Sequence, residues 1–186
     1  MAAARRTTEV HIESWTGAQF AARLDEAMGI YVRAMRYPEH TGAQRAVSAG
    51  KHTGLDGFAC RVALDSRDRL IGFGYGYTTR PGQWWHDLVR RALVREHTDD
   101  WLDDAFELSE LHVLPDGQGA GVGRELLTLL AGGIPHRAML LSTPDSDTRA
   151  FRLYRHMGFV DLARNYLFPG DGRPFAVLGA RLPLEL

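Results

Sequence analysis

Residues 111–127, LHVLPDGQGAGVGRELL, decide the fold of this chain. An apolar run ends at Pro115, and an amphipathic segment begins at Val122. Glycine occupies four alternate positions across this junction: Gly117, Gly119, Gly121 and Gly123. The pattern predicts a strand, a tight bend and a helix. Because glycine loses the most conformational freedom on folding, the cluster indicates that the bend needs unusual torsions or that a ligand approaches its backbone closely.

The composition is that of an ordinary globular protein, with 45% hydrophobic and 24% charged residues in a length of 186. This length is enough for a single domain with a hydrophobic core, so we expect one domain over residues 1–186. A formal charge of -1 gives no bulk attraction to nucleic acid or an anionic membrane, and we expect neither as a partner.

The first residues have no apolar signal region, and no stretch approaches the ~20 apolar residues that cross a bilayer. We therefore expect a cytoplasmic protein. The single cysteine, Cys60, excludes an internal disulfide and a cysteine-based zinc cluster, and its strand-like surroundings favour a small buried side chain over a nucleophile. The histidines show no ligand spacing, so we expect no metal.

Apolar periodicity predicts an α+β order of elements. Strands are expected near residues 10–14, 58–64, 70–78, 106–114, 138–143, 159–168 and 175–182. Helices are expected at 17–35 behind the N-cap Thr16, from Pro38 to about 49, at 121–131 and at 147–157, with a helical insertion at about 81–105. Antiparallel hairpins at both ends would enclose a β-α-β-α-β core with one parallel crossover.

Glycine also alternates with aromatic residues in the strand at 70–78, at Gly72, Gly74 and Gly76. One face of this strand is therefore bare. We expect a neighbouring element to pack closely against it.

Three phosphate-binding patterns compete for the bend. A P-loop needs G-x-x-x-x-G-K-[ST], and GK[ST] occurs nowhere. The dinucleotide pattern G-x-G-x-x-G fails because Val122 or Arg124 stands where its third glycine belongs. What remains is Q-x-x-G-x-G, formed by Gln118, Gly121 and Gly123. The free N–H groups of a helix N-terminus bind anions; the alternative is a tight turn without a ligand.

The bend resembles motif A of the GNAT superfamily of acyl-CoA N-acyltransferases, whose signature is V-x-P followed by Q/R-x-x-G-x-G/A. Val113 and Pro115 precede Gln118, Gly121 and Gly123 at the family's spacing.

Residues 150–159, AFRLYRHMGF, are similar to the second core motif of the same family, in which a helical tyrosine precedes a Gly-Phe strand start. Tyr154, Gly158 and Phe159 fill those places. The chain departs from the family at Asp147, where asparagine is frequent; an acid accepts hydrogen bonds from pantetheine amides but donates none.

The resemblance implies a mixed, mostly antiparallel central sheet flanked by helices, with two splayed parallel central strands. It implies that acetyl-CoA is the co-substrate, with its pyrophosphate at the glycine bend and its pantetheine arm along the strand before the bend. The cofactor-binding residues implied in this way are Leu111, His112, Val113, Gln118, Gly119, Ala120, Gly121, Val122, Gly123, Arg124 and Asp147.

The resemblance also implies catalytic residues. Tyr154 matches the family's general acid, which protonates the CoA sulfur, and Glu110 lies where family members keep a base or a water-holding carboxylate. Alternation along a strand places Glu110 and His112 on the same side, so His112 is a second candidate base or a pocket-lining residue. No cysteine stands in the motifs to carry an acyl group, which favours direct attack by the amine.

The family acetylates many amines, and the sequence does not name the acceptor. The acidic segment HTDDWLDDAFE, residues 97–107, would suit a cationic small molecule if it overhangs the acceptor mouth; a solvated helix face is the alternative. A non-catalytic acyl-CoA sensor and a protein-modifying enzyme remain open. The final hairpin offers an edge through which a homodimer can form.

Overall fold

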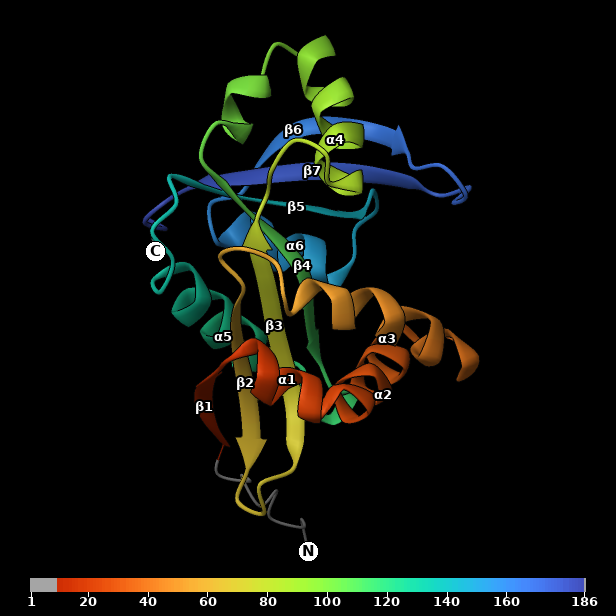
Figure 1. Cartoon of the computed structure of the whole chain (residues 1–186), viewed down its shortest axis with the longest axis vertical. Helices are drawn as coiled ribbons and strands as arrows, with labels where there is room; N and C mark the ends of the chain where they lie inside the picture. Colours follow the sequence, from red (N-terminus) through yellow and green to blue (C-terminus); the bar gives the residue numbers. More distant parts are fainter. Residues whose placement is uncertain (1–9, 186) are drawn as a thin grey trace, which may run out of the picture.

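The computed structural model describes residues 10–185 and contains a seven-stranded sheet in the order β1-β2-β3-β4-β5-β7-β6 (Figure 1). The strands are β1 (Val10–Trp15), β2 (Ala59–Asp65), β3 (Leu70–Thr78), β4 (Ala105–Val113), β5 (Ala138–Pro144), β6 (Val160–Leu167) and β7 (Pro174–Arg181). The helices are α1 (Gly17–Ala22), α2 (Leu24–Met35), α3 (His40–His52), α4 (Trp84–Arg95), α5 (Val122–Ala131) and α6 (Arg149–His156), with short 3-10 turns η1 (Asp99–Leu102) and η2 (Pro115–Gly117).

Neighbouring strands are antiparallel everywhere except at β4 and β5, which are parallel. These two strands pair only at residues 105–107 with 138–140, and then part. The expected α+β fold with a mostly antiparallel sheet and two splayed parallel strands is therefore confirmed. The expected helical region at 81–105 contains α4 and η1.

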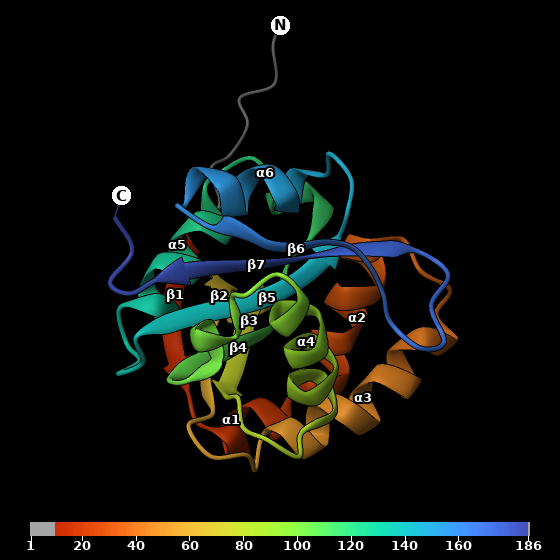
Figure 2. The same ribbon diagram turned by 90° about the horizontal axis from the view of Figure 1, so that it is seen from above.

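Helices cover both faces of the sheet. α5 and α6 pack on one face, where Leu127, Leu130 and Tyr154 meet Phe106 of β4. α1, α2 and α3 pack on the other face over β1 to β4, and α4 lies on that same side over β5, β7 and β6, opposite α6 (Figure 2). No helix among residues 10–185 is both long and apolar enough to span a bilayer.

The first helical region differs from its prediction. Thr16 is the expected N-cap, and it forms a reciprocal capping box with Gln19. The single helix expected at 17–35 is wrong, because Arg23 leaves helical torsions at φ -120° and divides α1 from α2. Its guanidinium donates hydrogen bonds to Glu26 and to the carbonyl of Asp68 in the β2–β3 turn. The break allows α2 to take a different direction from α1 and to pack over β3.

The glycines of β3 are packed as expected. A Cβ atom at Gly74 would lie 2.9 Å from Leu111 Cδ1, and one at Gly72 would lie 3.4 Å from Leu126 Cδ1 of α5. A Cβ at Gly76 would collide with the carbonyl oxygen of Glu107 and the ring of Phe106. The bare face of β3 thus allows β4 and α5 to come close.

We predict that Gly76→Ala lowers the free energy of unfolding by roughly 1–3 kcal/mol, as an overpacked core position does. The reason is that backbone and an aromatic ring, neither of which moves easily, occupy the space of the new methyl group. Urea denaturation measures the loss. Gly172→Ala is the matched control, since nothing lies within 4 Å of its Cβ position; equal stability of the two variants would contradict the packing.

Candidate active site

The parting of β4 from β5 creates the opening around which the candidate site is built. From Leu108 onward, no residue of β4 is paired with β5, while the opposite edge of β4 stays paired with β3 as far as Val113. Residues 111–113, expected to contact the pantetheine arm, lie on this unpaired edge. The Val113 carbonyl accepts from Gln118, and the other backbone groups on this edge are available to an extended ligand. Buried backbone groups need such a partner where water is excluded.

The glycine bend lies at the end of β4 and has the torsions that its composition predicts. Gly119 and Gly121 have φ values of 87° and 86°, in the left-handed region that glycine adopts readily. Gly121 is the N-cap of α5. The N–H groups of residues 119–124 meet no acceptor within residues 10–185, so six consecutive donors surround the start of α5. Such a cradle suits a phosphate.

The side chains around the cradle divide into a structural and a charged set. Gln118 donates its amide Nε2 to the carbonyl of Val113 at 3.0 Å, and so closes the loop onto β4. Arg124 is exposed at the rim. Arg149, at the start of α6, reaches the same rim, where its Nη1 lies 3.5 Å from the Cβ position of Gly119. The sequence motifs did not single out Arg149, because it comes from a different segment.

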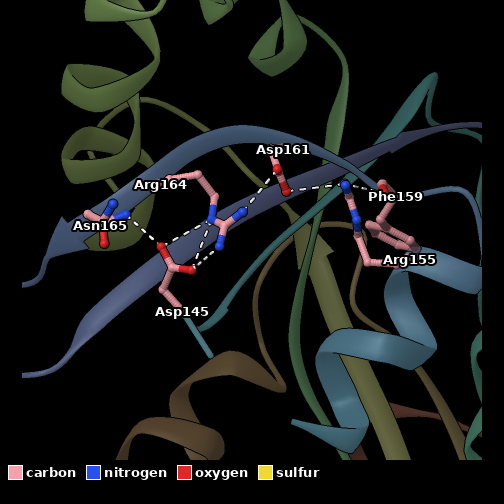
Figure 3. A network of polar contacts seen from close by, with 6 residues as sticks. All are labelled: Asp145, Arg155, Phe159, Asp161, Arg164 and Asn165. Atoms are coloured by element: carbon pink, nitrogen blue, oxygen red, sulfur yellow. Dashed lines mark hydrogen bonds and ion pairs between the residues drawn. The ribbon is translucent and has the colours of Figure 1, made fainter. Parts of the chain in front are cut away.

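A polar network fixes α6 beside the opening (Figure 3). The Asp145 carboxylate, at the end of β5, accepts from Arg164 Nε at 2.9 Å and from the Asn165 backbone N–H at 2.7 Å. Asp161 of β6 joins Arg164 to Arg155 of α6, each at 3.1 Å. α6 is therefore tied to both β5 and β6, which holds its inner face against the sheet.

Tyr154 lies on that inner face of α6. Its side chain is buried, and its ring packs against Phe159 at a centroid distance of 5.5 Å. The hydroxyl has no hydrogen-bond partner within residues 10–185. Burial and then the negative charge of Glu110 raise the pKa of Tyr154, so the phenol keeps its proton at neutral pH and can donate it.

Glu110 and His112 of β4 point to the same side, as strand alternation predicts, toward α2 and α3. His112 Nε2 lies 2.5 Å from Glu110 Oε2, and Arg45 of α3 donates its Nε to Glu110 Oε1. Burial raises the pKa of Glu110, but the charge of Arg45 and the hydrogen bond to His112 outweigh it and lower the pKa to about 2. Glu110 is therefore ionised and fully engaged at neutral pH.

A bulge in β4 brings a second carboxylate to this side. Tyr75 of β3 stands opposite Glu110, but the next residue, Gly76, stands opposite Leu108, so Ser109 is skipped. Glu107 consequently lies on the α3 side as well, although three residues separate it from Glu110. Tyr77 donates its hydroxyl to Glu107 Oε1 at 2.9 Å.

Glu107 is in the opposite electrostatic state to Glu110. It is 4% exposed, and its Oε2 has no hydrogen-bond partner in the described part of the chain. Burial, aided by the charge of Glu110, raises the pKa of Glu107 to about 8 despite the Tyr77 hydrogen bond and Arg45. Glu107 is the last residue of β4 paired with β5, so this proton-binding group lies where the strands part.

Asp147 and Cys60, two further residues discussed from the sequence, lie at the surface and in the core, respectively. Asp147 is exposed and pairs with Arg152 of α6 at 2.8 Å, so its side chain faces away from the core. Cys60 is fully buried, and burial raises the pKa of its thiol, as expected of a packing residue. No group of three or more His, Cys, Asp or Glu side chains within residues 10–185 is arranged to hold a metal.

The aspartates of the acidic segment lie at the start of β4, away from Glu110 and His112. Asp104 immediately precedes the first residue of β4, roughly 20 Å along the strand from Glu110. Asp103 and Asp104 line a separate hollow of about 530 Å³ with Arg80 and His136, at the end of the sheet opposite the glycine cradle. Asp100 pairs with Arg181 at 3.2 Å. These acidic residues therefore do not overhang the part of β4 that carries Glu110 and His112.

Sequence motifs located the cradle and Tyr154, but they missed Arg45, Arg149 and Glu107. Arg45 stands in α3, remote from the motifs, whereas Arg149 directly precedes the second motif but is not one of its signature positions. Glu107 was hidden by the bulge, since strict alternation puts it on the opposite face from Glu110. From the sequence, Glu107 belongs only to the acidic segment 97–107, because its burial is not apparent there.

We predict that Glu107→Gln gains stability relative to the wild type as pH rises. The folded pKa of Glu107 is about 8, above its ordinary 4.5, so the folded chain binds this proton more tightly than the unfolded chain. The contribution of Glu107 is complete below about pH 4.5 and is lost as pH rises toward about 8. Glutamine cannot ionise. Urea denaturation between about pH 5 and pH 9 should show a relative gain above about 1 kcal/mol; parallel pH curves would contradict this.

The chain, whose parallel pair parts after three residues and opens onto a helix N-terminus, shares its fold with solved GNAT-fold structures. Comparison with known proteins gives the family. Residues 24–159 match the Acetyltransferase (GNAT) family, and the chain belongs to it. The family consists of N-acetyltransferases that use acetyl-CoA.

One relative and several solved structures are similar over most of the chain. GCN5-like protein acetyltransferase Rv2170 from Mycobacterium tuberculosis is 38% identical over 87% of this chain and 93% of its own. A GNAT-family structure from Desulfovibrio desulfuricans has a TM-score of 0.66 at 15% identity, covering 93% of this chain and 99% of that chain. Phosphinothricin acetyltransferase from Sinorhizobium meliloti, in complex with AcCoA, has a TM-score of 0.62 at 20% identity, covering 93% and 88%.

Proposed function

We propose that the protein transfers an acetyl group from acetyl-CoA to a primary amine by direct attack. The observation that carries this proposal is the run of six unpaired N–H groups at residues 119–124, at the mouth of the opening between β4 and β5. In this proposal the pyrophosphate binds these donors and contacts Arg124 and Arg149, and the pantetheine arm lies along residues 111–113.

The chemistry needs a neutral amine and a proton for the departing thiolate. The amine nitrogen forms a bond to the thioester carbon, and the carbon–sulfur bond breaks. Tyr154 gives its proton to the sulfur; its place on the inner face of α6 and its hydroxyl, which has no partner within residues 10–185, support this role. The amine proton passes to a carboxylate base, for which β4 supplies two candidates, Glu110 and Glu107.

We assign proton uptake to Glu107 in preference to Glu110. A base is most effective when its pKa lies near the working pH. Glu107 has a pKa of about 8 and a free oxygen, whereas Glu110 has a pKa of about 2 and is held by Arg45 and His112. Glu110 then serves to orient His112 and Arg45 on the acceptor side.

A protein amine is a second candidate acceptor. The relative that is 38% identical is named a protein acetyltransferase, which favours a lysine side chain or an N-terminus over a free small molecule. The acceptor panel that tests the function therefore includes peptides beside polyamines, aminoglycosides and amino acids.

We predict that CoA release from acetyl-CoA depends on an amine and falls roughly 100-fold or more in Tyr154→Phe, the range of a lost general acid. A thiol reagent follows the release. Tyr166→Phe, which removes a hydroxyl bonded to the carbonyl of Leu88 far from the opening, is the matched control and should leave turnover unchanged. Acetyl-CoA binding without release by any amine would identify a non-catalytic sensor, and no binding at all would refute the cradle.

We predict that Glu107→Gln removes a rise in kcat/KM that the wild type shows as pH passes about 8, because glutamine takes up no proton. Glu110→Gln is the matched variant and should lower activity while keeping this rise, moved to lower pH because the charge of Glu110 raises the pKa of Glu107. The acceptor's own ionisation is common to all three proteins, so the comparison isolates the side chain. Loss of the rise in Glu110→Gln alone would assign the base to Glu110.

A further inference from the structure

Arg45 carries hydrogen-bond donors that nothing in residues 10–185 accepts. Its Nε donates to Glu110 Oε1, while Nη1 and Nη2 have no acceptor among those residues. The side chain is 34% exposed, so solvent and a ligand reach it from outside. A guanidinium has five N–H donors in a fixed fork, and its two ends can hold two different carboxylates.

The protein supplies only one of these carboxylates. Glu110 is the ion-pair partner of Arg45 in the described part of the chain. Glu107, the other acid nearby, accepts from Tyr77 instead. His52, which faces the same region, has a pKa lowered to about 4 by burial and by Arg45, so it brings no competing charge at neutral pH.

The second guanidinium on this side is already engaged. Arg173, in the turn between β6 and β7, donates to the Tyr37 hydroxyl at 2.8 Å and pairs with Asp171 at 2.7 Å. Tyr31 packs between Tyr37 and His112, with ring centroids at 5.6 and 5.2 Å. Burial raises the pKa of Tyr31 and the charge of Arg45 opposes this rise, so Arg45 lies near these aromatic rings. Unlike Arg173, it has Nη1 and Nη2 donors that meet no acceptor within residues 10–185.

We propose that Arg45 binds a carboxylate of the acceptor, so that the enzyme selects amines that carry one. This inference rests on the proposed acetyl transfer. The Nη1 and Nη2 end of the guanidinium forms two parallel hydrogen bonds with the acceptor carboxylate, while Nε stays on Glu110. The carboxylate comes from a free amino acid or from an acidic residue beside a target lysine; the recognised chemistry is the same.

Matched acceptors test the proposal. L-lysine is compared with cadaverine, and 4-aminobutyrate with n-butylamine, since each pair shares its amine and differs in the carboxylate. A third pair is the blocked peptides Gly-Lys-Glu and Gly-Lys-Gln. In the wild type we expect kcat/KM to be roughly 10-fold or more higher for the acidic member, as charged hydrogen bonds provide. The free acids and the peptides show which source the enzyme uses.

Variants of Arg45 test whether this residue causes the preference for acceptors that carry a carboxylate. In Arg45→Gln the acidic-to-neutral ratio should fall toward one, and in Arg45→Lys part of the ratio should persist, because the charge remains without the fork. Arg33→Gln, an exposed arginine on the neighbouring helix α2, is the control and should keep the wild-type ratio. A ratio taken within one protein cancels any general loss of activity. Equal rates in the wild type, or an unchanged ratio in Arg45→Gln, would overturn the proposal.

A binding measurement separates this proposal from the proposed function. Nε-acetyllysine and N-acetylcadaverine are titrated calorimetrically in the presence of CoA. If no amine releases CoA but Nε-acetyllysine binds more tightly in an Arg45-dependent way, acetyl transfer fails and the Arg45 site stands. If neither turnover nor binding distinguishes the carboxylate, the Arg45 site is refuted.

Discussion

The early parting of β4 and β5 is the constraint on which the structure depends. Two central strands that separate after three pairs leave a row of backbone donors and acceptors without partners, in a region where helices pack on both faces. Unpaired backbone groups are costly when buried, so the gap favours an extended ligand or ordered water that supplies the missing hydrogen bonds. Close packing at the β3 glycines fixes β3 against β4 and α5. The hydrogen bond between Gln118 and Val113 fixes the loop at the end of β4, so the elements around the gap stay in place.

Two carboxylates in one short stretch of β4 reach opposite protonation states, and their neighbours explain why. Glu110 has a guanidinium and an imidazole against it, and these outweigh the penalty of burial. Glu107 has a phenol at one oxygen and, within residues 10–185, no hydrogen-bond partner at the other, so burial prevails. The charge on Glu110 also raises the pKa of Glu107. The bulge at Ser109 is what brings both carboxylates to the same side of the sheet.

Much of the fold followed from the sequence, because apolar period, glycine spacing and the Thr16 cap are local signals. The order of elements, the parallel pair and the cradle of Gly119 and Gly121 were predicted in this way. The break at Arg23 was not, since it depends on a contact with the distant turn at Asp68. A bulge is equally invisible to alternation, and for this reason the shared direction of Glu107 and Glu110 emerged only in three dimensions.

The surroundings of Glu110 and His112, the proposed acceptor side, were the least predictable part for the same physical reason. The acidic segment looked like a rim because it precedes β4 in the chain, yet strand direction carries it to the far end of the sheet. Arg45 and Arg173 arrive from a helix and a turn that share no motif with β4. The position of a segment in the sequence shows which end of β4 it joins. Which side chains lie over the middle of β4 is apparent only from the fold.

The placement of helices on the two sheet faces has an evolutionary consequence. Tyr154, with α5 and α6, belongs to one face, whereas Arg45, Arg173 and α4 belong to the other. Substitutions in α2, α3 or the β6–β7 turn therefore alter one half of the chemistry while leaving the residues of the other half in place. A lineage built on this plan can diversify in what it modifies without first having to reinvent how it holds the donor.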